Sequence, residues 1–387
     1  MPTDLLELSE EQREIRNLAR EFAEQEIAPF IADWDERAYF EPSIVKKMGD
    51  LGFLGMLIPE EFDGLGVDTP TYLIALEEIA AVDASTAVLM SVHNSLPTQM
   101  ILRFGNDEQR DRFLKPMARG ELLGAFALSE PESGSDAASL TTQAVLDGDT
   151  WVLNGTKSWV TSGSHAGVIL AMARTDTRDD RKGARGIATF IVTPDLPGFH
   201  VGKKEDKLGL RSSPTVQLNF DNLRVPAANL LGNASEGFIY AMQSLENGRL
   251  GIAAQAIGIA RAALDAATAY AAQREQFKTP IREFQAIQFK LADMATRIAA
   301  SRTLLHSAAR AKDRGENVRQ ASSMAKLFAS ETAMFATNQA VQIFGGYGYV
   351  KDYPVERLFR DAKVTEIYEG TSEIQRIVIA RELYARD

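Results

Sequence analysis

The spacing of apolar residues changes twice along this chain and divides it into three segments. Apolar residues recur at helical steps over residues 1–121, in short β-prone runs over residues 122–232, and at helical steps again over residues 233–387. We therefore expect an α+β multidomain protein with an N-terminal all-α domain, a middle β domain and a C-terminal α-helical bundle domain. The middle runs follow one another without helices between them, which favours an antiparallel sandwich or barrel over a parallel βαβ sheet.

The first segment starts with a recognisable helix signal. Ser9 and Gln12 have the spacing of a capping box, and the apolar residues after them lie on one face of a helix that ends at Pro29. Turn-forming clusters separate the segments that follow. We expect further short helices at Val45–Met48, Tyr72–Ala80 and Pro97–Phe104.

The middle segment contains five runs that we expect to be strands. Asn154–Gly155 lies inside the second run and predicts a hairpin turn there. Most residues of Arg174–Gly186 are charged, which predicts a solvent-exposed loop between two strands. The five runs are Ala125–Leu128, Trp151–Val160, Val168–Ala173, Ile187–Val192 and Val216–Val225.

The last segment predicts four helices that pack as a bundle. The first two are rich in alanine, which lets helices approach closely and also suits an interface between subunits. The four helices are expected over residues 251–271, Ile287–Ala311, Gln320–Phe344 and Glu373–Tyr384.

Composition argues against several other classes of protein. A net charge of −11 and a pI near 5.1 argue against nucleic-acid binding, which needs a basic face. The absence of cysteine excludes disulfides and thiolate sites, and the four histidines lack metal-ligand spacing, so we expect no metal. We find no apolar run of roughly 18 residues and no targeting pattern at the N-terminus. We therefore expect no membrane span and a location in the bacterial cytoplasm or, for a mature form, the mitochondrial matrix.

The stretch Val364–Arg376, VTEIYEGTSEIQR, places a carboxylate on a bend directly before a helix start. Gly370 permits the bend, and Ser372 with Gln375 has the spacing of a capping box. A fixed Glu369 that substrate desolvates would have a raised pKa suited to a general base. The alternative is a surface acid near a helix N-terminus, where the helix dipole favours negative charge in any case.

Five further stretches carry polar or aromatic residues that could bind a ligand. Each also has an ordinary structural explanation: a polar loop, a core tryptophan, an interior arginine with a partner, a surface arginine, and a helix stop. The stretches are Phe126–Asp136 (FALSEPESGSD), Trp159–Thr161 (WVT), Leu245–Leu250 (LENGRL), Arg274–Gln285 (REQFKTPIREFQ) and Gln342–Gly346 (QIFGG).

Taken together and in this order, these stretches resemble the signatures of the acyl-CoA dehydrogenases over essentially the whole chain. The resemblance implies an FAD-dependent oxidoreductase that acts on CH–CH bonds. In that family a carboxylate at the YEG position removes the α-proton of an acyl-CoA while the β-hydrogen leaves as hydride to flavin N5. Glu369 occupies that position.

The resemblance also implies roles for individual residues. Ser129 matches a hydroxyl at the flavin pyrimidine edge, Trp159 an aromatic ring over the isoalloxazine and Thr161 a hydroxyl near N5. Arg274 and Gln342 match residues that reach the FAD of a neighbouring subunit. The implied FAD-binding residues are Phe126, Leu128, Ser129, Ser135, Trp159, Val160, Thr161, Arg274, Gln276, Phe277, Phe284, Gln285, Gln342, Ile343, Gly345, Gly346, Thr371 and Glu373. The implied substrate-binding residues are Ser135, Glu246, Arg249 and Gly370.

Three residues depart from patterns found in the family. Glu132 and Lys278 stand where glycine is usual, and Glu132 would strain its loop if that position needs a positive φ. Gly248 stands where some branched- and long-chain relatives carry their catalytic glutamate. This leaves Glu369 as the only base compatible with the family and makes the chain most similar to the short-chain (butyryl-CoA) type.

The activity implied is α,β-dehydrogenation of a short-chain, or short-to-medium or branched, acyl-CoA to the trans-2-enoyl-CoA in fatty acid β-oxidation. Electrons would pass to an electron-transfer flavoprotein. The resemblance also implies a homo-oligomer, usually a homotetramer built as a dimer of dimers. The alternatives are an acyl-CoA oxidase-like enzyme that uses O2 and a non-catalytic flavoprotein of the same fold.

Overall fold

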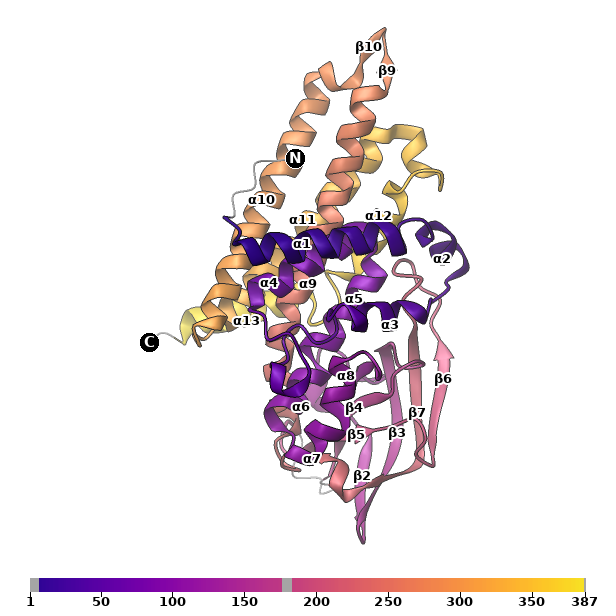
Figure 1. Cartoon of the computed structure of the whole chain (residues 1–387), viewed down its shortest axis with the longest axis vertical. Helices are drawn as coiled ribbons and strands as arrows, with labels where there is room; N and C mark the ends of the chain where they lie inside the picture. The colour runs from indigo at the N-terminus through magenta and orange to yellow at the C-terminus, as the bar shows by residue number, and fades with distance from the viewer. Residues whose placement is uncertain (1–6, 176–182, 386–387) are drawn as a thin grey trace.

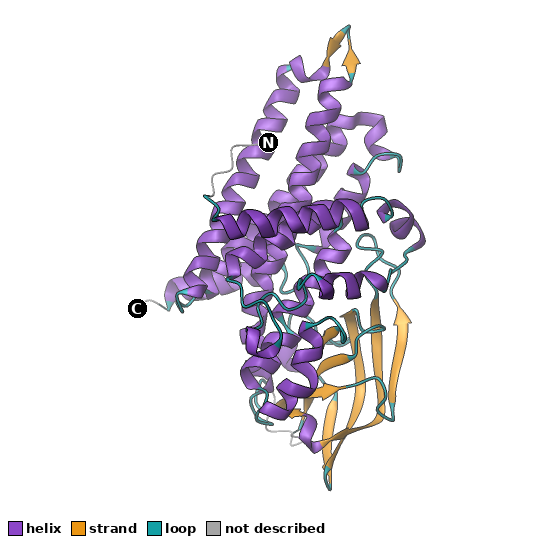
Figure 2. Cartoon of the chain, viewed as in Figure 1, coloured by secondary structure: helices purple, strands orange, loops and turns teal. Residues whose placement is uncertain are grey.

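The computed structural model describes residues 7–175 and 183–385, and the statements below refer to these residues. Figure 1 shows long helices of the C-terminal segment in the upper part of the molecule and the sheet in the lower right part, with N-terminal helices lying across the middle. Figure 2 shows the sheet in the same lower right part, with a short strand pair at the top, at the ends of two long helices. The predicted divisions after residues 121 and 232 fall between α8 and β1 and between β8 and α9.

Among the described residues of the N-terminal segment, helices joined by turns are the only regular elements. The predicted capping box at Ser9 and Gln12 is confirmed and opens the first helix, which continues into a π-helical turn over Ala23–Ile27. Helices α4 and α5 are buried over almost their whole length because they lie between other elements. The helices are α1 Glu10–Phe22, α2 Ile31–Arg37, α3 Ser43–Asp50, α4 Thr69–Val82, α5 Ala84–Ser95, α6 Pro97–Phe104, α7 Asp107–Gln109 and α8 Lys115–Ala118.

The middle segment forms one eight-stranded sheet. The strand order is β6-β7-β3-β2-β4-β5-β8, and β1 pairs with β4. The predicted β domain is confirmed, but the sheet is mixed rather than wholly antiparallel, because β1 runs parallel to β4. The strands are β1 Gly124–Ala127, β2 Gln143–Asp147, β3 Thr150–Thr161, β4 Val168–Arg174, β5 Ile187–Val192, β6 Phe199–Lys204, β7 Thr215–Pro226 and β8 Leu230–Leu231.

The predicted hairpin at Asn154–Gly155 is wrong. These residues lie within β3, at a register shift in its pairing with β7, and the turn that precedes β3 is at Asp147–Thr150. Gly155 is needed for close approach: a Cβ there would lie 2.4 Å from Oγ1 of Thr142. The predicted solvent-exposed loop begins where β4 ends, and its residues 176–182 lie outside the described part.

The C-terminal segment contains the four predicted helices and a further short one, α12. Helix α9 is long and apolar enough to cross a membrane, but 83% of its apolar window is buried inside the protein, as expected of a core helix. It packs against α4, α5, α10 and α11. The elements are α9 Gly237–Gln273, β9 Glu275–Gln276, β10 Thr279–Pro280, α10 Gln285–Asp313, α11 Arg319–Phe344, α12 Val355–Val364 and α13 Ser372–Tyr384.

Candidate active site

Glu369 lies on a left-handed turn between α12 and α13. Its φ is 52° and that of Gly370 is 91°. A positive φ is uncommon for residues other than glycine and must be held in place by the surrounding structure. Two buried side chains do so: Gln375 Nε2 donates to the carbonyls of Glu369 and Gly370 at 3.2 and 2.9 Å, and Lys326 Nζ donates to the Gly370 carbonyl at 2.8 Å.

The predicted capping box at Ser372 and Gln375 is wrong, although a helix does begin there. Thr371 is the N-cap, and its hydroxyl accepts from the Ile374 backbone at 3.3 Å. Ser372 is the first residue of α13. Because the left-handed turn directs two carbonyls toward α13, the Gln375 side chain is used to hold that turn instead of capping the helix.

The carboxylate of Glu369 is buried, although the residue as a whole is partly exposed. Neither carboxylate oxygen has a hydrogen-bond partner among the described residues. The alternative of a solvated surface acid is therefore wrong. The carboxylate lies against α9 at Gly248, where a Cβ would fall 1.7 Å from Oε2. Glu369 in this position and a side chain at residue 248 are therefore mutually exclusive.

Burial raises the pKa of Glu369 to about 7, because an ionised carboxylate loses its hydration there. The positive charges of Lys326 and Arg249 oppose this rise. Burial also lowers the pKa of Lys326 to about 8 and lowers that of Arg249. A carboxyl group with a near-neutral pKa and two buried cations close by has the properties of a general base that works near pH 7.

The predicted substrate-binding residues have different surroundings. Arg249 is buried on α9; its Nη1 donates to Ser323 Oγ at 3.2 Å, and its Nε has no partner among the described residues. Glu246, one turn earlier, is half-buried and pairs with Arg319 at 2.9 Å. Ser135 is exposed on the loop after β1. Arg249 and Gly370 therefore lie beside Glu369, whereas Glu246 belongs to a separate ion pair.

Trp159 is exposed, so the alternative of a core tryptophan is wrong. Its side chain is 62% exposed and its φ is 60°, at a register shift in the pairing of β3 with β7. The preceding backbone N–H, of Ser158, donates to the Ser129 carbonyl at 2.9 Å. This bond joins the loop after β1 to the strand that carries Trp159 and Thr161.

A buried ion pair that we did not predict supports this region. Lys157 Nζ lies 2.7 Å from Glu130 Oε1 and also donates to the Leu128 carbonyl at 3.2 Å. Glu130 accepts backbone N–H groups of Thr141 and Thr142 at 2.6 and 3.0 Å. The pair therefore ties both ends of the loop to β3. In the sequence, Lys157 was visible only as a charged residue inside an otherwise β-prone run.

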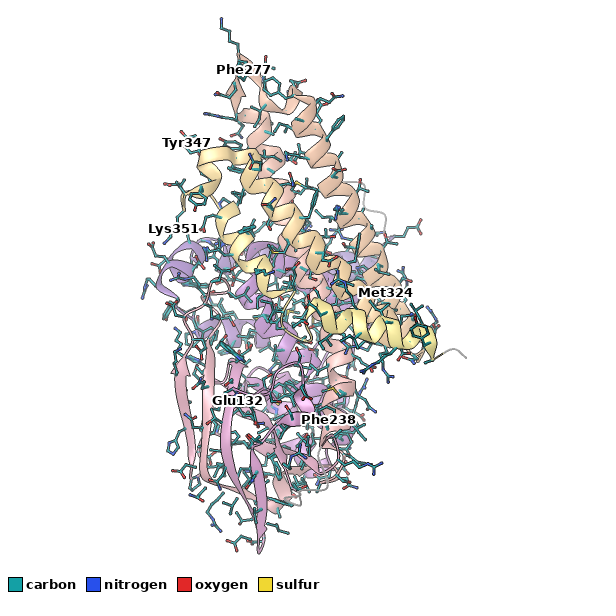
Figure 3. All side chains as sticks on the ribbon, turned by 180° about the vertical axis from the view of Figure 1, so that it is seen from behind. Glu132, Phe238, Phe277, Met324, Tyr347 and Lys351 are labelled. Atoms are coloured by element: carbon teal, nitrogen blue, oxygen red, sulfur yellow. The ribbon has the colours of Figure 1, made fainter. Side chains whose placement is uncertain are left out.

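The expected strain at Glu132 is absent. Glu132 is not among the residues with positive φ, and its side chain is exposed (Figure 3). By contrast Phe277 and Lys278, at the tip of the β9–β10 hairpin, have φ values of 53° and 60°. The departure from glycine therefore has a conformational consequence at Lys278 and none at Glu132.

The remaining predicted cofactor residues form a second group at the far end of the helices. Figure 3 shows Phe277 at the outer tip of the hairpin and Tyr347 near it, with Glu132 far below them beside the sheet. Phe277 is 91% exposed, and the Arg274 guanidinium lies 5.4 Å from the Tyr347 ring centre. The structure thus joins the hairpin to the segment after α11, but not to Trp159.

The predicted cofactor residues outside the hairpin region, which include Trp159, form the first group, and those near the β9–β10 hairpin form the second. The two groups differ in how exposed their residues are. In the first group Leu128 and Val160 are buried, Phe126, Ser129, Thr161 and Thr371 are half-buried, and Glu373 is exposed. In the second group Ile343 is buried, Arg274 and Phe284 are half-buried, and Gln276, Gln285, Gln342, Gly345 and Gly346 are exposed.

The residues around Trp159 fit a flat aromatic cofactor. The indole offers an exposed ring, Thr161 and Ser129 offer hydroxyl groups, and the backbone of the Ser129 loop is fixed by Lys157 and Glu130. A fixed aromatic surface with hydrogen-bond donors orients a flavin ring and tunes it. Together with the buried carboxylate of Glu369 on a left-handed turn, these features are those of a flavin-dependent oxidoreductase.

Comparison with known families supports this class and makes it specific. The acyl-CoA dehydrogenase N-terminal domain matches residues 9–121, the middle domain residues 125–223 and the C-terminal domain residues 235–384. The chain belongs to the acyl-CoA dehydrogenase family. It is therefore an FAD-dependent oxidoreductase that acts on CH–CH bonds.

Individual relatives are similar over almost their full length. The chain is 50% identical to an acyl-CoA dehydrogenase of Bacillus subtilis over 98% of this chain and 99% of the relative. It is also 50% identical to the mitochondrial short-chain specific acyl-CoA dehydrogenase of Rattus norvegicus, over 98% and 91%.

Solved structures share the fold. The butyryl-CoA dehydrogenase of Megasphaera elsdenii superposes with a TM-score of 0.95 at 42% identity, covering 98% of this chain and 99% of that one. A chain from a structure described as the electron transferring flavoprotein of Acidaminococcus fermentans has a TM-score of 0.96 at 46% identity, over 99% and 100%. A glutaryl-CoA dehydrogenase of Mycobacterium smegmatis in complex with FADH2 has a TM-score of 0.92 at 33% identity, over 98% and 95%.

Proposed function

We propose that this protein dehydrogenates short-chain acyl-CoA thioesters to trans-2-enoyl-CoA, with Glu369 as the base. The observation that carries the proposal is the buried carboxylate of Glu369, which has no hydrogen-bond partner within residues 7–175 and 183–385, lies against Gly248 and has a pKa of about 7. Relatives named short-chain specific and butyryl-CoA dehydrogenase support the short acyl chain. The same relatives support a role in fatty acid β-oxidation.

In this mechanism Glu369 accepts the α-proton of the thioester, and the electron pair of that C–H bond becomes the new double bond. FAD, when bound, would supply the acceptor for the β-hydrogen, which leaves as hydride. The backbone N–H of Glu369 would donate to the thioester carbonyl and stabilise the negative charge that develops there. Substrate that fills the site would exclude water from the carboxylate and strengthen it as a base.

We place the flavin ring against Trp159, with Thr161 and Ser129 as hydroxyl donors. Arg274, with its planar pair of donors, suits a pyrophosphate. Figure 1 shows its hairpin, β9–β10, at the opposite end of the molecule from β3, the strand that carries Trp159, so Arg274 would serve the FAD of a second copy. This supports a homo-oligomer in which each cofactor site uses two subunits, with the family's tetramer as the expected form.

We also propose an electron acceptor and a cellular location for this protein. An electron-transfer flavoprotein would reoxidise the reduced cofactor, in line with the description of one structural neighbour. The relatives include bacterial and mitochondrial proteins, which supports the bacterial cytoplasm or the mitochondrial matrix. Within the same fold, an oxidase would instead release peroxide rapidly in air.

Glu369→Gln tests the proposal. The variant should retain FAD and bind CoA thioesters, but its anaerobic bleaching by butyryl-CoA should be slower by several orders of magnitude because the amide cannot accept the proton. Glu331→Gln is the matched control, since Glu331 is a partly exposed acid on α11 that pairs with Arg376. Rapid bleaching of the Glu369→Gln variant would remove the assignment, and rapid peroxide release by the parent enzyme would favour an oxidase.

A further inference from the structure

Lys326 is a fully buried lysine in the N-terminal half of α11. Its exposed fraction is 0%, although lysine is among the residues least often buried without a partner. Its Nζ donates to the Gly370 carbonyl at 2.8 Å. Lysine burial of this kind is costly and calls for a compensating interaction. The compensation here lies in the turn that carries the base.

The contact holds a backbone conformation that would otherwise be unfavourable. Glu369 has φ 52°, a left-handed conformation that is unfavourable for a residue other than glycine. The Gly370 carbonyl receives two donors, Lys326 from α11 and Gln375 from α13. The turn is therefore fastened to two helices at the residue directly after the base.

Lys326 also belongs to the set of charges around the carboxylate. The groups that face Glu369 are Arg249 from α9, Lys326 from α11, Tyr72 from α4 and Tyr368 from its own segment. Lys326 in turn faces Glu366, Glu369, Glu373 and Arg249. The two tyrosines are neutral near pH 7, because burial raises the pKa of each. The ionised carboxylate is thus favoured by two buried cations.

We propose that Lys326 is a positioning residue for the base: it fastens the Glu369–Gly370 turn through the Gly370 carbonyl and supplies a buried positive charge that favours the ionised carboxylate. This rests on the proposed role of Glu369. Lys326 has no part in the proton transfer itself, since it contacts the turn and not the carboxylate. Among the charges that lower the pKa of Glu369, that of Lys326 acts most strongly.

The test separates the two roles with three variants of the FAD-loaded enzyme. Lys326→Met removes both the donor and the charge, Lys326→Gln retains a donor without the charge, and Lys326→Arg retains the charge. For each variant, anaerobic flavin reduction by butyryl-CoA is measured by stopped flow from pH 6 to pH 9.5. Melting temperature and FAD content establish that each variant is folded.

Removing the charge should raise the pKa of Glu369. The pH at which flavin reduction reaches half of its maximal rate should therefore rise by about one pH unit in Lys326→Met and Lys326→Gln. At pH values below the parental midpoint this amounts to about a tenfold loss of rate, which alkaline pH restores. Lys326→Arg should keep the parental midpoint. Lys326→Met also lacks a donor to the Gly370 carbonyl. Its maximal rate of flavin reduction at alkaline pH should therefore be lower than that of Lys326→Gln.

A binding measurement, in which no reaction takes place, accompanies the kinetic measurements. Binding of a CoA thioether, which lacks the acidic α-proton, is followed by calorimetry in buffers of different ionisation enthalpy, which reports the protons taken up on binding. The pH at which uptake is half complete should rise in Lys326→Met in parallel with the kinetic midpoint. Folded Lys326→Met and Lys326→Gln with the parental midpoints in both measurements would overturn the proposal. Failure of the parent enzyme to bleach would instead overturn the proposed function.

Discussion

The carboxylate of Glu369 rests against Gly248 of α9, so closely that a Cβ at residue 248 would fall 1.7 Å from Oε2 and 2.5 Å from Cδ. The atoms in the way belong to the end of a side chain and not to the backbone. A methyl group at residue 248 would therefore move the carboxylate rather than disrupt the helix. Two residues that are far apart in sequence thus determine together where the proposed base can lie.

We expect Gly248→Ala to slow flavin reduction by butyryl-CoA by about 100-fold, because a displacement of about 1 Å at a reacting group is enough for such a loss. Folding should be maintained, since alanine is favoured over glycine inside a helix by about 1 kcal/mol. Stopped-flow bleaching measures the rate, and flavin absorbance with thermal melting measures the folded holoenzyme.

The control for that variant is Gly251→Ala. It adds the same methyl group one turn further along α9, where the nearest atom is Ser91 Oγ at 2.3 Å and not the carboxylate. It should lose much less activity than Gly248→Ala. Equal losses in the two variants would mean that contact with Glu369 is not the reason for the effect.

The burial of Glu369 also predicts how the stability of the folded protein depends on pH. The pKa is about 7 in the folded protein against an ordinary value of 4.5, so the folded state binds more protons between these pH values. Stability should therefore fall as pH rises through this window. Glu369→Gln cannot ionise, so relative to the parent it should gain up to about 3 kcal/mol between pH 4.5 and pH 8.

Melting temperatures of parent and variant at pH 5 and pH 8 check this. The difference between the two proteins should be small at pH 5 and should favour the variant at pH 8. Glu331→Gln, which removes a carboxylate that is not buried, should not be more stable than the parent at pH 8. A variant that is less stable than the parent at pH 8 would contradict the burial of an ionising carboxylate.

Features that depend on neighbouring residues in sequence could be predicted. The capping box at Ser9 and Gln12 and the bend at Glu369–Gly370 are determined within a few residues, and strand β5 was predicted with its observed limits. The residues alone made Glu369 a candidate base, because a glutamate, a glycine and a helix start adjoin in the chain, and left a surface acid as the alternative. The resemblance to the acyl-CoA dehydrogenases then favoured the base.

Features that depend on tertiary partners could not be predicted. Asn154–Gly155 is a strong local hairpin signal, but pairing of β3 with β7 through this point overrides it. The role of Lys326 depends on a carbonyl 44 residues away, and that of Lys157 on a carboxylate 27 residues away. In the sequence both lysines look like ordinary charged residues in regular elements.

The β9–β10 hairpin offers a test of backbone strain. Phe277 and Lys278 form its two-residue loop, and both have positive φ, as in a type I′ turn, which favours glycine or asparagine. Lys278→Gly should raise the free energy of unfolding by about 0.5 kcal/mol, since relief of strain exceeds the added freedom of the unfolded chain. Thermal melting measures the gain, and Lys278→Ala, which keeps the strain, should not show it.

The ion pair of Glu130 and Lys157 should be needed for folding of the loop after β1 and of β3 around Trp159, where we place the flavin ring. Their side chains are 3% and 0% exposed, and the joining distance is 2.7 Å. Lys157→Met leaves a buried carboxylate without its cation, which typically costs about 3 to 5 kcal/mol. The backbone amides of Thr141 and Thr142 still donate to Glu130, so we expect the lower end of that range.

The double variant Glu130→Gln with Lys157→Met removes both charges and keeps an amide oxygen as an acceptor. It should be more stable than Lys157→Met alone, because no unpaired charge remains buried. Thermal unfolding measured by flavin fluorescence reports stability and FAD release together. Because the pair fixes the Leu128 carbonyl and the strand next to Trp159, FAD should be released at a lower temperature in Lys157→Met than in the double variant. The single variant Glu130→Gln completes the comparison. A loss of stability in the double variant equal to the sum of the losses in Lys157→Met and Glu130→Gln would show that the two residues act independently and that their contact does not hold the loop.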